Sequence, residues 1–460
     1  MNIVKTGMLW IDSDDISMHD LQRLHESYTY QHPREPDQKF STITYAKDRV
    51  GIPAGDLEKA RHLLPDIEKV DDRTCSEPFK TPVKLTGLTL RDYQETALSE
   101  ALDYISNEGG TSFNLSGSPG SGKSVMLSAI IAELGVRTLI IAHLSMLTTQ
   151  LQKEIEEFTD AKVTVLNSDN SELGDINIAT SQFIAQHPEI WYQIKKHIGL
   201  IAVDEAESIG SETTLRILQR AHAKYRIAIT ATFIRSVDGR TPALRDMIGH
   251  KVITLQNNDL LKPTVIAVKC DEAFTPPKNK NLYKRALISF FKRNTSIDQK
   301  INIIVVASLK KKRQVLIATD LTDFQNRYAE NLVALGYSVA VVNGSTSKKD
   351  RDKILEQYNK GKIDVLLGFG VLNAGLSIPR ISTIIRVSTP GNLEKLEQLI
   401  GRGRREYDGK EGMWFIDLIF TGFRYASEKR MAFYNKQARK EGWKYALTSW
   451  EKFYEKLINS

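Results

Sequence analysis

The sequence predicts an α/β fold built on parallel sheets, and three segments carry this prediction. Residues 111–115 read as a short strand that leads into a glycine-rich turn, and residues 125–134 after the turn read as a helix. Residues 200–203 (Leu-Ile-Ala-Val) form an apolar run that ends in Asp-Glu-Ala-Glu. A run that is apolar at every position is typical of a parallel strand covered on both faces. Residues 413–418 predict a last strand near the end of the chain.

The glycine-rich turn fits the pattern G-x-x-x-x-G-K-[ST] of phosphate-binding loops. Glycines let backbone N–H groups point at phosphate oxygens, and the helix N-terminus adds partial positive charge. Lys123 would reach the β- and γ-phosphates of ATP, and Ser124 would hold Mg²⁺. The alternative is a glycine-rich turn that binds nothing. The strand before the turn and the helix after it make this alternative the weaker one. The expected nucleotide-binding residues are Gly117, Ser118, Pro119, Gly120, Ser121, Gly122, Lys123 and Ser124.

Two carboxylates, Asp204 and Glu205, directly follow the buried strand at residues 200–203. Ligands of open α/β sheets bind beyond the carboxyl ends of the strands, so these side chains can meet the phosphate loop. We expect Asp204 to hold Mg²⁺ and Glu205 to orient or deprotonate the attacking water. An acidic pair after a strand is ordinarily a solvated loop, but the phosphate loop upstream favours the catalytic interpretation.

Residues 398–405 (Gln-Leu-Ile-Gly-Arg-Gly-Arg-Arg) have the spacing Gln-x-x-Gly-Arg-x-x-Arg. Here the chain resembles the superfamily 2 helicases and translocases, whose sixth motif has this form. The resemblance implies two tandem RecA-like domains, with Gln398, Arg402 and Arg405 facing the γ-phosphate across the cleft between them. Arg405 matches the arginine finger, and Arg402 matches the second phosphate-contacting arginine. Planar guanidinium groups suit this role because they stabilise charge on the transferred phosphoryl group.

Further helicase-like segments follow in the family's order between residues 88 and 405. Residues 90–94 (Leu-Arg-Asp-Tyr-Gln) resemble the adenine-reading motif, with Gln94 as the base contact. Residues 375–379 (Gly-Leu-Ser-Ile-Pro) resemble the fifth motif, which places Gly375 near the nucleotide. The residues that the resemblance assigns to nucleic-acid contact or coupling are Thr230, Thr232, His143, Thr180, Thr319 and Gly344.

Departures from the DEAD-box pattern favour DNA over RNA as the substrate. The second motif reads Asp-Glu-Ala-Glu, and the sixth begins with Gln instead of His. Residues 370–379 and 398–405 resemble the phage UvsW-type branch-migration helicases, which are related to the XPB-like group. The resemblance implies an ATP-dependent motor that remodels branched or forked DNA in replication, recombination or repair. The alternatives are an RNA helicase, a duplex-DNA translocase subunit that does not unwind, and an ATP-gated nucleic-acid clamp.

The length of 460 residues predicts about three domains, and the hydrophobic content of 41% predicts sizeable cores. The two cysteines, Cys75 and Cys270, cannot form a disulfide framework, and no zinc-ligand cluster is visible. No apolar run of about 18 residues predicts a membrane span, and the N-terminus lacks the pattern of a signal peptide. We therefore expect a cytoplasmic protein without a membrane partner, in the host cytoplasm if a phage encodes it. We favour a monomer.

The formal net charge is +7, and much of the positive charge lies between Lys262 and Arg313. This stretch holds 13 Lys or Arg residues against three acidic ones. A basic connector between the RecA-like domains would neutralise phosphates and make nucleic-acid binding dependent on salt. A solvated lysine surface is the alternative. The densest part of the stretch is Lys310, Lys311, Lys312 and Arg313.

Residues 1–86 are expected to form a small accessory domain, followed by RecA-like domains at 87–260 and 261–460. The resemblance to phage proteins implies that the accessory domain contacts duplex DNA. Simple packing against the first RecA-like domain is the alternative, and the sequence leaves the two open. The conceivable DNA contacts are Tyr28, Tyr30 and Arg34.

Overall fold

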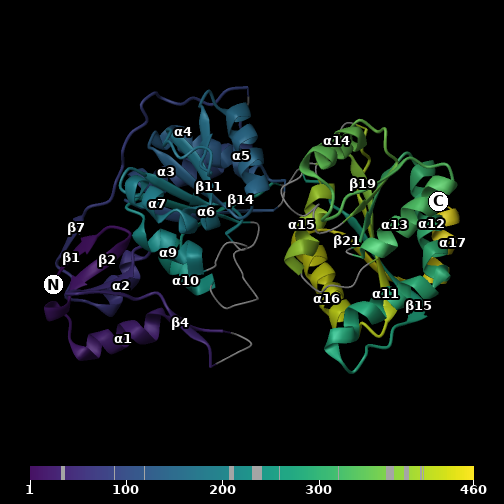
Figure 1. Ribbon diagram of the computed structural model, residues 1–460, viewed down its shortest axis with the longest axis horizontal. Helices are drawn as coiled ribbons and strands as arrows, with labels where there is room; N and C mark the ends of the chain where they lie inside the picture. The colour runs from purple at the N-terminus through teal and green to yellow at the C-terminus, as the bar shows by residue number, and fades with distance from the viewer. Residues whose placement is uncertain are drawn as a thin grey trace. The chain divides into compact units, whose positions relative to one another are not determined.

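The chain divides into two compact units, Met1–Asn257 and Asn258–Ser460, each containing a large sheet with helices on its faces (Figure 1). No helix in the described part of the chain combines the length and the apolar character that a membrane span requires. The computed structural model describes residues 1–32, 37–87, 89–118, 120–206, 212–230, 241–257, 260–319, 321–368, 378–387, 393–404, 407 and 409–459.

A small sheet with the strand order β5-β6-β2-β1-β7 forms the N-terminal part of the first unit. Helices α1 (Met18–Tyr28) and α2 (Leu57–Leu63) bury Leu24, Tyr28 and Ala60 in its core. A two-stranded ribbon of β3 and β4 follows α1. The bounds of these strands are β1 Asn2–Lys5, β2 Met8–Asp12, β3 Thr29–Gln31, β4 Lys39–Ser41, β5 Thr44–Ala46, β6 Arg49–Pro53 and β7 Lys69–Asp72.

The rest of the first unit is a seven-stranded sheet with the order β10-β11-β9-β12-β13-β8-β14, in which all neighbours are parallel. Helices α3, α4 and α5 share a buried cluster on one face, and α6, α7, α9 and α10 share one on the other. The strands are β8 Ser112–Gly117, β9 Thr138–Ala142, β10 Val163–Val165, β11 Ile176–Thr180, β12 Leu200–Val203, β13 Tyr225–Thr230 and β14 Val252–Leu255. The helices are α3 Asp92–Ser106, α4 Lys123–Leu134, α5 Ser145–Phe158, α6 Ser181–Gln186, α7 Pro188–Ile194, α9 Glu212–Arg220 and α10 Thr241–Ile248.

The second unit repeats this plan with a parallel sheet of order β17-β18-β16-β19-β20-β15-β21. Helices α11, α12, α13 and α17 contribute to one buried cluster, and α14, α15 and α16 to the other. The strands are β15 Thr264–Ala273, β16 Gln314–Ala318, β17 Val339–Val341, β18 Val365–Gly368, β19 Ile381–Arg386, β20 Trp414–Thr421 and β21 Lys444–Ser449. The helices are α11 Tyr283–Arg293, α12 Thr295–Lys310, α13 Thr322–Ala334, α14 Lys348–Asn359, α15 Leu393–Gly403, α16 Arg424–Glu441 and α17 Trp450–Ile458.

The predicted fold class is confirmed, because two parallel α/β sheets follow a small N-terminal sheet. Adjacent residues of the core strands point into opposite clusters, as Leu139 and Ile140 do on β9. The expectation of a last strand at 413–418 was wrong, since β21 follows β20 in the chain. β21 was missed because it is an edge strand with half-exposed Lys, Thr and Ser residues and so lacks a continuous apolar run.

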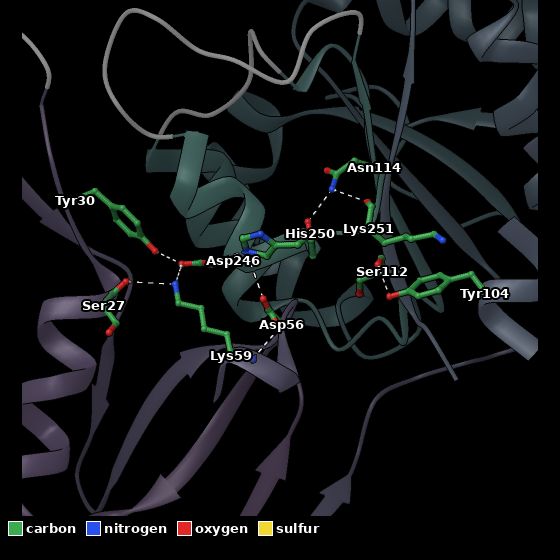
Figure 2. Close-up of polar contacts among 11 residues, drawn as sticks. Ser27, Tyr30, Asp56, Lys59, Tyr104, Ser112, Asn114, Asp246, His250 and Lys251 are labelled. Carbon is green, nitrogen blue, oxygen red and sulfur yellow. Dashed lines mark hydrogen bonds and ion pairs between the residues drawn. The ribbon is translucent and has the colours of Figure 1, made fainter. Parts of the chain in front are cut away.

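The small N-terminal sheet packs against the first large sheet, and a buried carboxylate lies at the junction (Figure 2). Asp246 of α10, with 2% of its side chain exposed, lies 2.6 Å from the Lys59 ammonium nitrogen. It also accepts a hydrogen bond from the Tyr30 hydroxyl. His250 Nε2 lies 3.1 Å from Asp246 and 3.4 Å from Asp56. Residues from both parts of the unit therefore meet in one polar cluster.

The tyrosines that the sequence suggested as DNA contacts belong to this packing instead. Tyr28 is 1% exposed in the core of the small sheet, and the Tyr30 hydroxyl is held by Asp246. Burial, reinforced by the negative charge of Asp246, raises the pKa of both phenols above their usual range. Both side chains are thus occupied within the protein. Arg34 lies outside the described residues.

Candidate active site

The expected residues of the first unit lie at one edge of its sheet. Because β8, β9, β11, β12 and β13 are parallel, their carboxyl ends meet there. The phosphate loop leaves β8 at this edge, and β13, between β8 and β12, ends at Thr230. Asp204 and Glu205 follow β12, His143 follows β9, and Thr180 ends β11. The structure thus brings together residues expected to act on the nucleotide and residues expected to contact nucleic acid.

The loop between β8 and α4 has the backbone that phosphate binding requires. Gly120 and Gly122 have φ angles of 89° and 79°, left-handed values that favour glycine. A Cβ atom on Gly117 would lie 2.4 Å from Ser121 Oγ, so a larger residue would not fit. Lys123 is the first residue of α4, and its Nζ lies 2.7 Å from the Gly117 carbonyl oxygen. The ammonium group is therefore folded over the loop that would hold the phosphates.

Ser124 and Asp204 are the residues that would hold Mg²⁺. Ser124 is the second residue of α4, directly after Lys123. The backbone N–H of Asp204 donates to the Ile141 carbonyl oxygen at 3.0 Å, which fixes where the chain leaves the sheet. Within the described ranges, no group of three or more His, Cys, Asp or Glu residues could hold a metal ion. The available donors fit Mg²⁺, which is usually bound by one or two protein oxygens together with substrate phosphates.

The backbone of Glu205 is strained. Its φ angle is 46°, and Lys312 is the one other non-glycine residue with positive φ in the described part of the chain. A side-chain-bearing residue in this region pays roughly 1–2 kcal/mol, and such strain accumulates at functional sites. The strain therefore marks the residue that the sequence had assigned to the attacking water.

The N-terminus of α3 lies against the phosphate loop. Gln94 is 4% exposed, and a Cβ atom on Gly122 would lie 2.3 Å from its Nε2. The Gln94 side chain also accepts the backbone N–H of Arg91 at 3.0 Å, which caps α3. The Tyr93 hydroxyl donates to the Ser121 carbonyl oxygen at 3.0 Å. Tyr93 is a site residue that the sequence motifs did not predict, although its place next to Gln94 was the available signal.

In the second unit, the expected coupling and basic residues lie at opposite edges of the sheet. Thr319 follows β16 and Gly344 follows β17, so both lie at the carboxyl edge. The basic run 310–313 directly precedes β16 and lies at the amino edge. The five residues of β16 span about 16 Å at the usual rise of a strand. The structure therefore does not bring the basic run together with Thr319 and Gly344.

The stretch 262–313, expected to be a basic connector, forms β15, α11 and α12 of the second unit. Part of its charge is used internally. Arg313 stacks on Trp414 at 4.1 Å and donates to the carbonyl oxygens of Ser382 and Gly412 at 3.1 and 3.2 Å. Burial lowers the pKa of the Arg313 guanidinium. The exposed cations of the run are Lys310, Lys311 and Lys312.

Helix α15 carries two of the three expected residues of the sixth motif. Gln398 and Arg402 are four positions apart on α15 and therefore lie on one face of the helix. Arg402 is 7% exposed, and its neighbours Leu399 and Ile400 are buried in the core beneath the helix. The expected site residues that lie outside the described part of the chain are Arg405, Pro119, Thr232 and Gly375.

Comparisons with known proteins match a family model to part of each large sheet. Residues 87–235 match the family "Type III restriction enzyme, res subunit", and residues 283–406 match "Helicase conserved C-terminal domain". The chain is 27% identical to "Probable helicase D10" of Escherichia phage T5, over 72% of this chain and 72% of that protein. It is 24% identical to "DNA 3'-5' helicase XPB" of Mycobacterium tuberculosis, over 72% of this chain and 61% of that protein.

The fold is also found among solved structures. S. cerevisiae Dbp5 bound to RNA and ADP BeF3 superposes with a TM-score of 0.55 at 14% identity, over 80% of this chain and 97% of that chain. This likeness supports a RecA-like fold for the two parallel sheets. The phosphate loop and the acidic pair lie in the first family match, and Gln398 and Arg402 lie in the second. Together, the two matches, the relatives and the fold identify the chain as an ATP-hydrolysing helicase of superfamily 2.

Proposed function

We propose that this helicase is a DNA motor that uses ATP to remodel branched or forked DNA. The observation that carries the proposal is the shared carboxyl edge of the first sheet. Lys123 and Asp204 follow strands that end at this edge, as do Thr230, Thr180 and His143, the residues expected to contact nucleic acid or to couple it to the nucleotide. A nucleotide bound at this edge would lie near the elements expected to grip a strand.

In the proposed reaction, Lys123 neutralises the β- and γ-phosphates, and Glu205 orients or deprotonates the attacking water. Mg²⁺, held by Ser124 and Asp204, would supply positive charge to the phosphate oxygens. Arginines of the second unit, Arg402 and Arg405, would stabilise charge on the transferred phosphoryl group. Their contribution from a separate unit would make hydrolysis depend on closure of the two units around ATP.

Strand β13 offers a route from the nucleotide to the nucleic acid. It lies between β12 and β8 and pairs with both, with Thr230 opposite Ser116 of β8 and Ala228 opposite Val203 of β12. Thr230 is 1% exposed, so it cannot shift without moving these neighbours. A displacement of the phosphate loop or of Asp204 would therefore reach Thr230 through a single pair of neighbouring strands.

The preference for DNA rests on two kinds of support. The mycobacterial relative is named a DNA helicase, and the sixth motif begins with Gln instead of the His of the DEAD-box group. The likeness to RNA-bound Dbp5, at 14% identity, concerns the fold alone. The narrower assignment to branched DNA rests on the resemblance of residues 370–379 and 398–405 to the UvsW-type helicases.

A second candidate function is translocation on duplex DNA without unwinding. The match of residues 87–235 to the res subunit of type III restriction enzymes favours it. An enzyme of this kind would hydrolyse ATP on plain duplex DNA, and a partner would have to supply cutting. The two candidates differ in the DNA structure that they require, which makes them separable by experiment.

The test is steady-state ATP hydrolysis at one fixed salt concentration, without nucleic acid and with single-stranded DNA, duplex DNA, a four-way junction or RNA. We expect the strongest stimulation by the four-way junction, together with movement of this junction. Lys123→Ala serves as the inactive control. Equal stimulation by plain duplex without junction movement would favour the translocase, and stimulation mainly by RNA would overturn the DNA assignment.

A further inference from the structure

Arg404 stands between the two arginines of the sixth motif and is bonded to a distant part of the second unit. The backbone N–H of Leu261 donates to the Arg404 carbonyl oxygen at 3.1 Å. In return, Arg404 Nε donates to the Leu261 carbonyl oxygen at 3.2 Å. Both main-chain polar groups of Leu261 are thus bonded to this one residue, 143 positions away.

A second nitrogen of the guanidinium is also bonded. Arg404 NH1 donates to Glu441 Oε2 at 2.7 Å, and the guanidinium lies over the Trp443 ring at 5.4 Å. Arg404 is 6% exposed. A buried guanidinium with three directional partners has little freedom, so the position of Arg404 is closely defined.

Leu261 belongs to the entry segment, residues 260–263, with which the described part of the second unit begins. The first unit ends at Asn257, four positions earlier. The entry segment leads directly into β15, and the backbone N–H of Lys444 donates to the carbonyl oxygen of Pro263 at 3.1 Å. Any displacement that the covalent chain passes from the first unit to the second must travel through this segment.

We propose that Arg404 is a positioning residue that couples the entry segment to the arginines of the sixth motif. Arg402 precedes Arg404 by two residues, and Arg405 follows it directly. A displacement of the entry segment would move Arg404 and, with it, both neighbouring arginines. This inference rests on the proposed function, in which Arg402 and Arg405 act on ATP.

The end of α15 has a second attachment that does not involve the entry segment. The Lys410 ammonium donates to the carbonyl oxygens of Gly403 and Pro379 at 2.6 and 3.0 Å. Lys410 therefore provides a partner for the last carbonyl oxygen of the helix, as cations near a helix C-terminus do. Loss of the Arg404 side chain should remove one of the two bonds to Leu261 and leave α15 folded, but the guanidinium would no longer tie the end of the helix to the entry segment.

The test compares variants that remove different parts of this arrangement. Arg404→Lys keeps a cation for Glu441 but lacks the planar fork that also reaches the Leu261 carbonyl oxygen. Glu441→Gln weakens the ion pair and leaves the bonds between Arg404 and Leu261. We measure kcat and KM for DNA-stimulated ATP hydrolysis, binding of ADP and of ADP with aluminium fluoride, and the melting temperature.

We expect Arg404→Lys and Arg404→Ala to lower kcat about 10- to 100-fold, the range expected when catalytic groups are misplaced by about 1 Å. Affinity for the transition-state mimic ADP with aluminium fluoride should fall in parallel, while affinity for ADP alone stays within about twofold. Glu441→Gln should lower the melting temperature at least as much as Arg404→Lys but keep kcat within about threefold. A role in stability alone would not separate kcat from melting temperature in this way.

Three outcomes would overturn the coupling role. The first is a kcat of Arg404→Lys near that of the wild type, and the second is an equal loss of kcat in Glu441→Gln. The third is an equal loss of binding affinity for ADP and for ADP with aluminium fluoride. If Arg404→Ala fails to fold, Arg404→Lys and Glu441→Gln still decide between the possibilities. Arg402→Ala separates this inference from the proposed function. If Arg402→Ala lowers kcat and Arg404→Lys does not, only the coupling role fails. If Arg402→Ala leaves kcat unchanged, the proposal that Arg402 acts on ATP fails as well.

Discussion

The hydroxyl of Tyr93 donates a hydrogen bond to the main-chain carbonyl oxygen of Ser121 at 3.0 Å. This bond ties α3 to the phosphate loop through a residue other than Gln94, whose amide group touches the loop at Gly122. The helix that carries the expected base contact and the loop that would hold the phosphates are therefore joined at two points. We expect them to act as one surface toward the nucleotide.

Removing this bond should weaken ATP binding more than chemistry. A neutral hydrogen bond contributes about 1 kcal/mol, so we expect Tyr93→Phe to raise KM for ATP about fivefold, with kcat within about twofold. Tyr104→Phe is the matched control, because Tyr104 also lies on α3 but its hydroxyl donates to the Ser112 carbonyl oxygen, at the start of β8 (Figure 2). An equal rise in KM in both variants would show a general effect on α3. It would contradict a specific role of the bond between Tyr93 and Ser121 in ATP binding.

Lys123→Ala should abolish ATP turnover and leave DNA binding largely intact. The ammonium group lies 2.7 Å from the Gly117 carbonyl oxygen, inside the loop expected to hold the phosphates, and Lys123 itself is not expected to contact nucleic acid. Steady-state hydrolysis and fluorescence anisotropy with labelled DNA measure the two properties separately. Lys251→Ala, which removes an exposed ion pair with Glu100 at 3.2 Å, should change neither. Unchanged turnover in Lys123→Ala would contradict the assignment of residues 117–124 as the phosphate-binding loop.

Glu205 should show a conflict between stability and activity. Glu205→Gln and Glu205→Gly both remove the carboxylate, so both should lower kcat about 10²- to 10⁴-fold, the usual contribution of a general base. Glycine also relieves the left-handed φ angle of 46° and should make Glu205→Gly more stable than Glu205→Gln by up to about 1 kcal/mol. Urea unfolding of the two variants measures this difference. A Gly variant less stable than the Gln variant would show that the backbone at Glu205 carries no strain.

The sequence allowed the fold class and the nucleotide half of the site to be predicted, because both depend on local patterns. β12 is apolar at every position, and the phosphate loop is a contiguous motif between β8 and α4. Carboxyl ends of parallel strands meet at one edge, so the placement of Asp204 near the loop followed from strand direction alone.

Two residues considered as nucleic-acid contacts have partners far away in the chain. Tyr30 is held by Asp246, 216 positions later, and Arg313 donates to Ser382, 69 positions later. Neither partner has a local signature, so an aromatic or basic residue looked available for DNA when it was already engaged. The bond between Arg404 and Leu261 could not be predicted either, because these residues also lie far apart in the chain and have no local signature.

The buried carboxylate of Asp417 should make the second unit sensitive to acid. Burial alone would raise its pKa, but Arg430 Nε at 2.8 Å and Arg386 NH1 at 3.3 Å outweigh burial and hold the pKa below its usual range. A depressed folded-state pKa gives stability that is fully present above the unfolded pKa, about 3.9, and is lost as pH falls through the folded value. Hydrogen exchange in β20 should therefore rise as pH falls below about 4, after correction for intrinsic exchange rates.

Substitution of Asp417 tests the same cluster at neutral pH. Asp417→Asn leaves two buried guanidinium groups without their carboxylate, and breaking a buried ion pair in this way costs about 3–5 kcal/mol. Asp271→Asn, on the exposed side of β15, should cost less than about 0.5 kcal/mol. The difference between wild type and Asp417→Asn should shrink as pH falls below 4. A difference independent of pH would mean that the charge of Asp417 is not what stabilises β20.

Asp246 should hold the small N-terminal sheet on the first large sheet. Its carboxylate is 2% exposed and lies 2.6 Å from Lys59 Nζ, so Asp246→Ala should destabilise the junction by about 3 kcal/mol. Asp71→Ala is the matched control, because the ion pair of Asp71 with Arg73 is similarly short at 2.7 Å but has roughly half of each side chain exposed. Hydrogen exchange in β1 and β2 should rise in Asp246→Ala and stay unchanged in Asp71→Ala. Since Asp246 lies outside the phosphate loop, ATP binding should persist in both variants. Equal hydrogen exchange in β1 and β2 of the two variants would refute the anchoring role of Asp246.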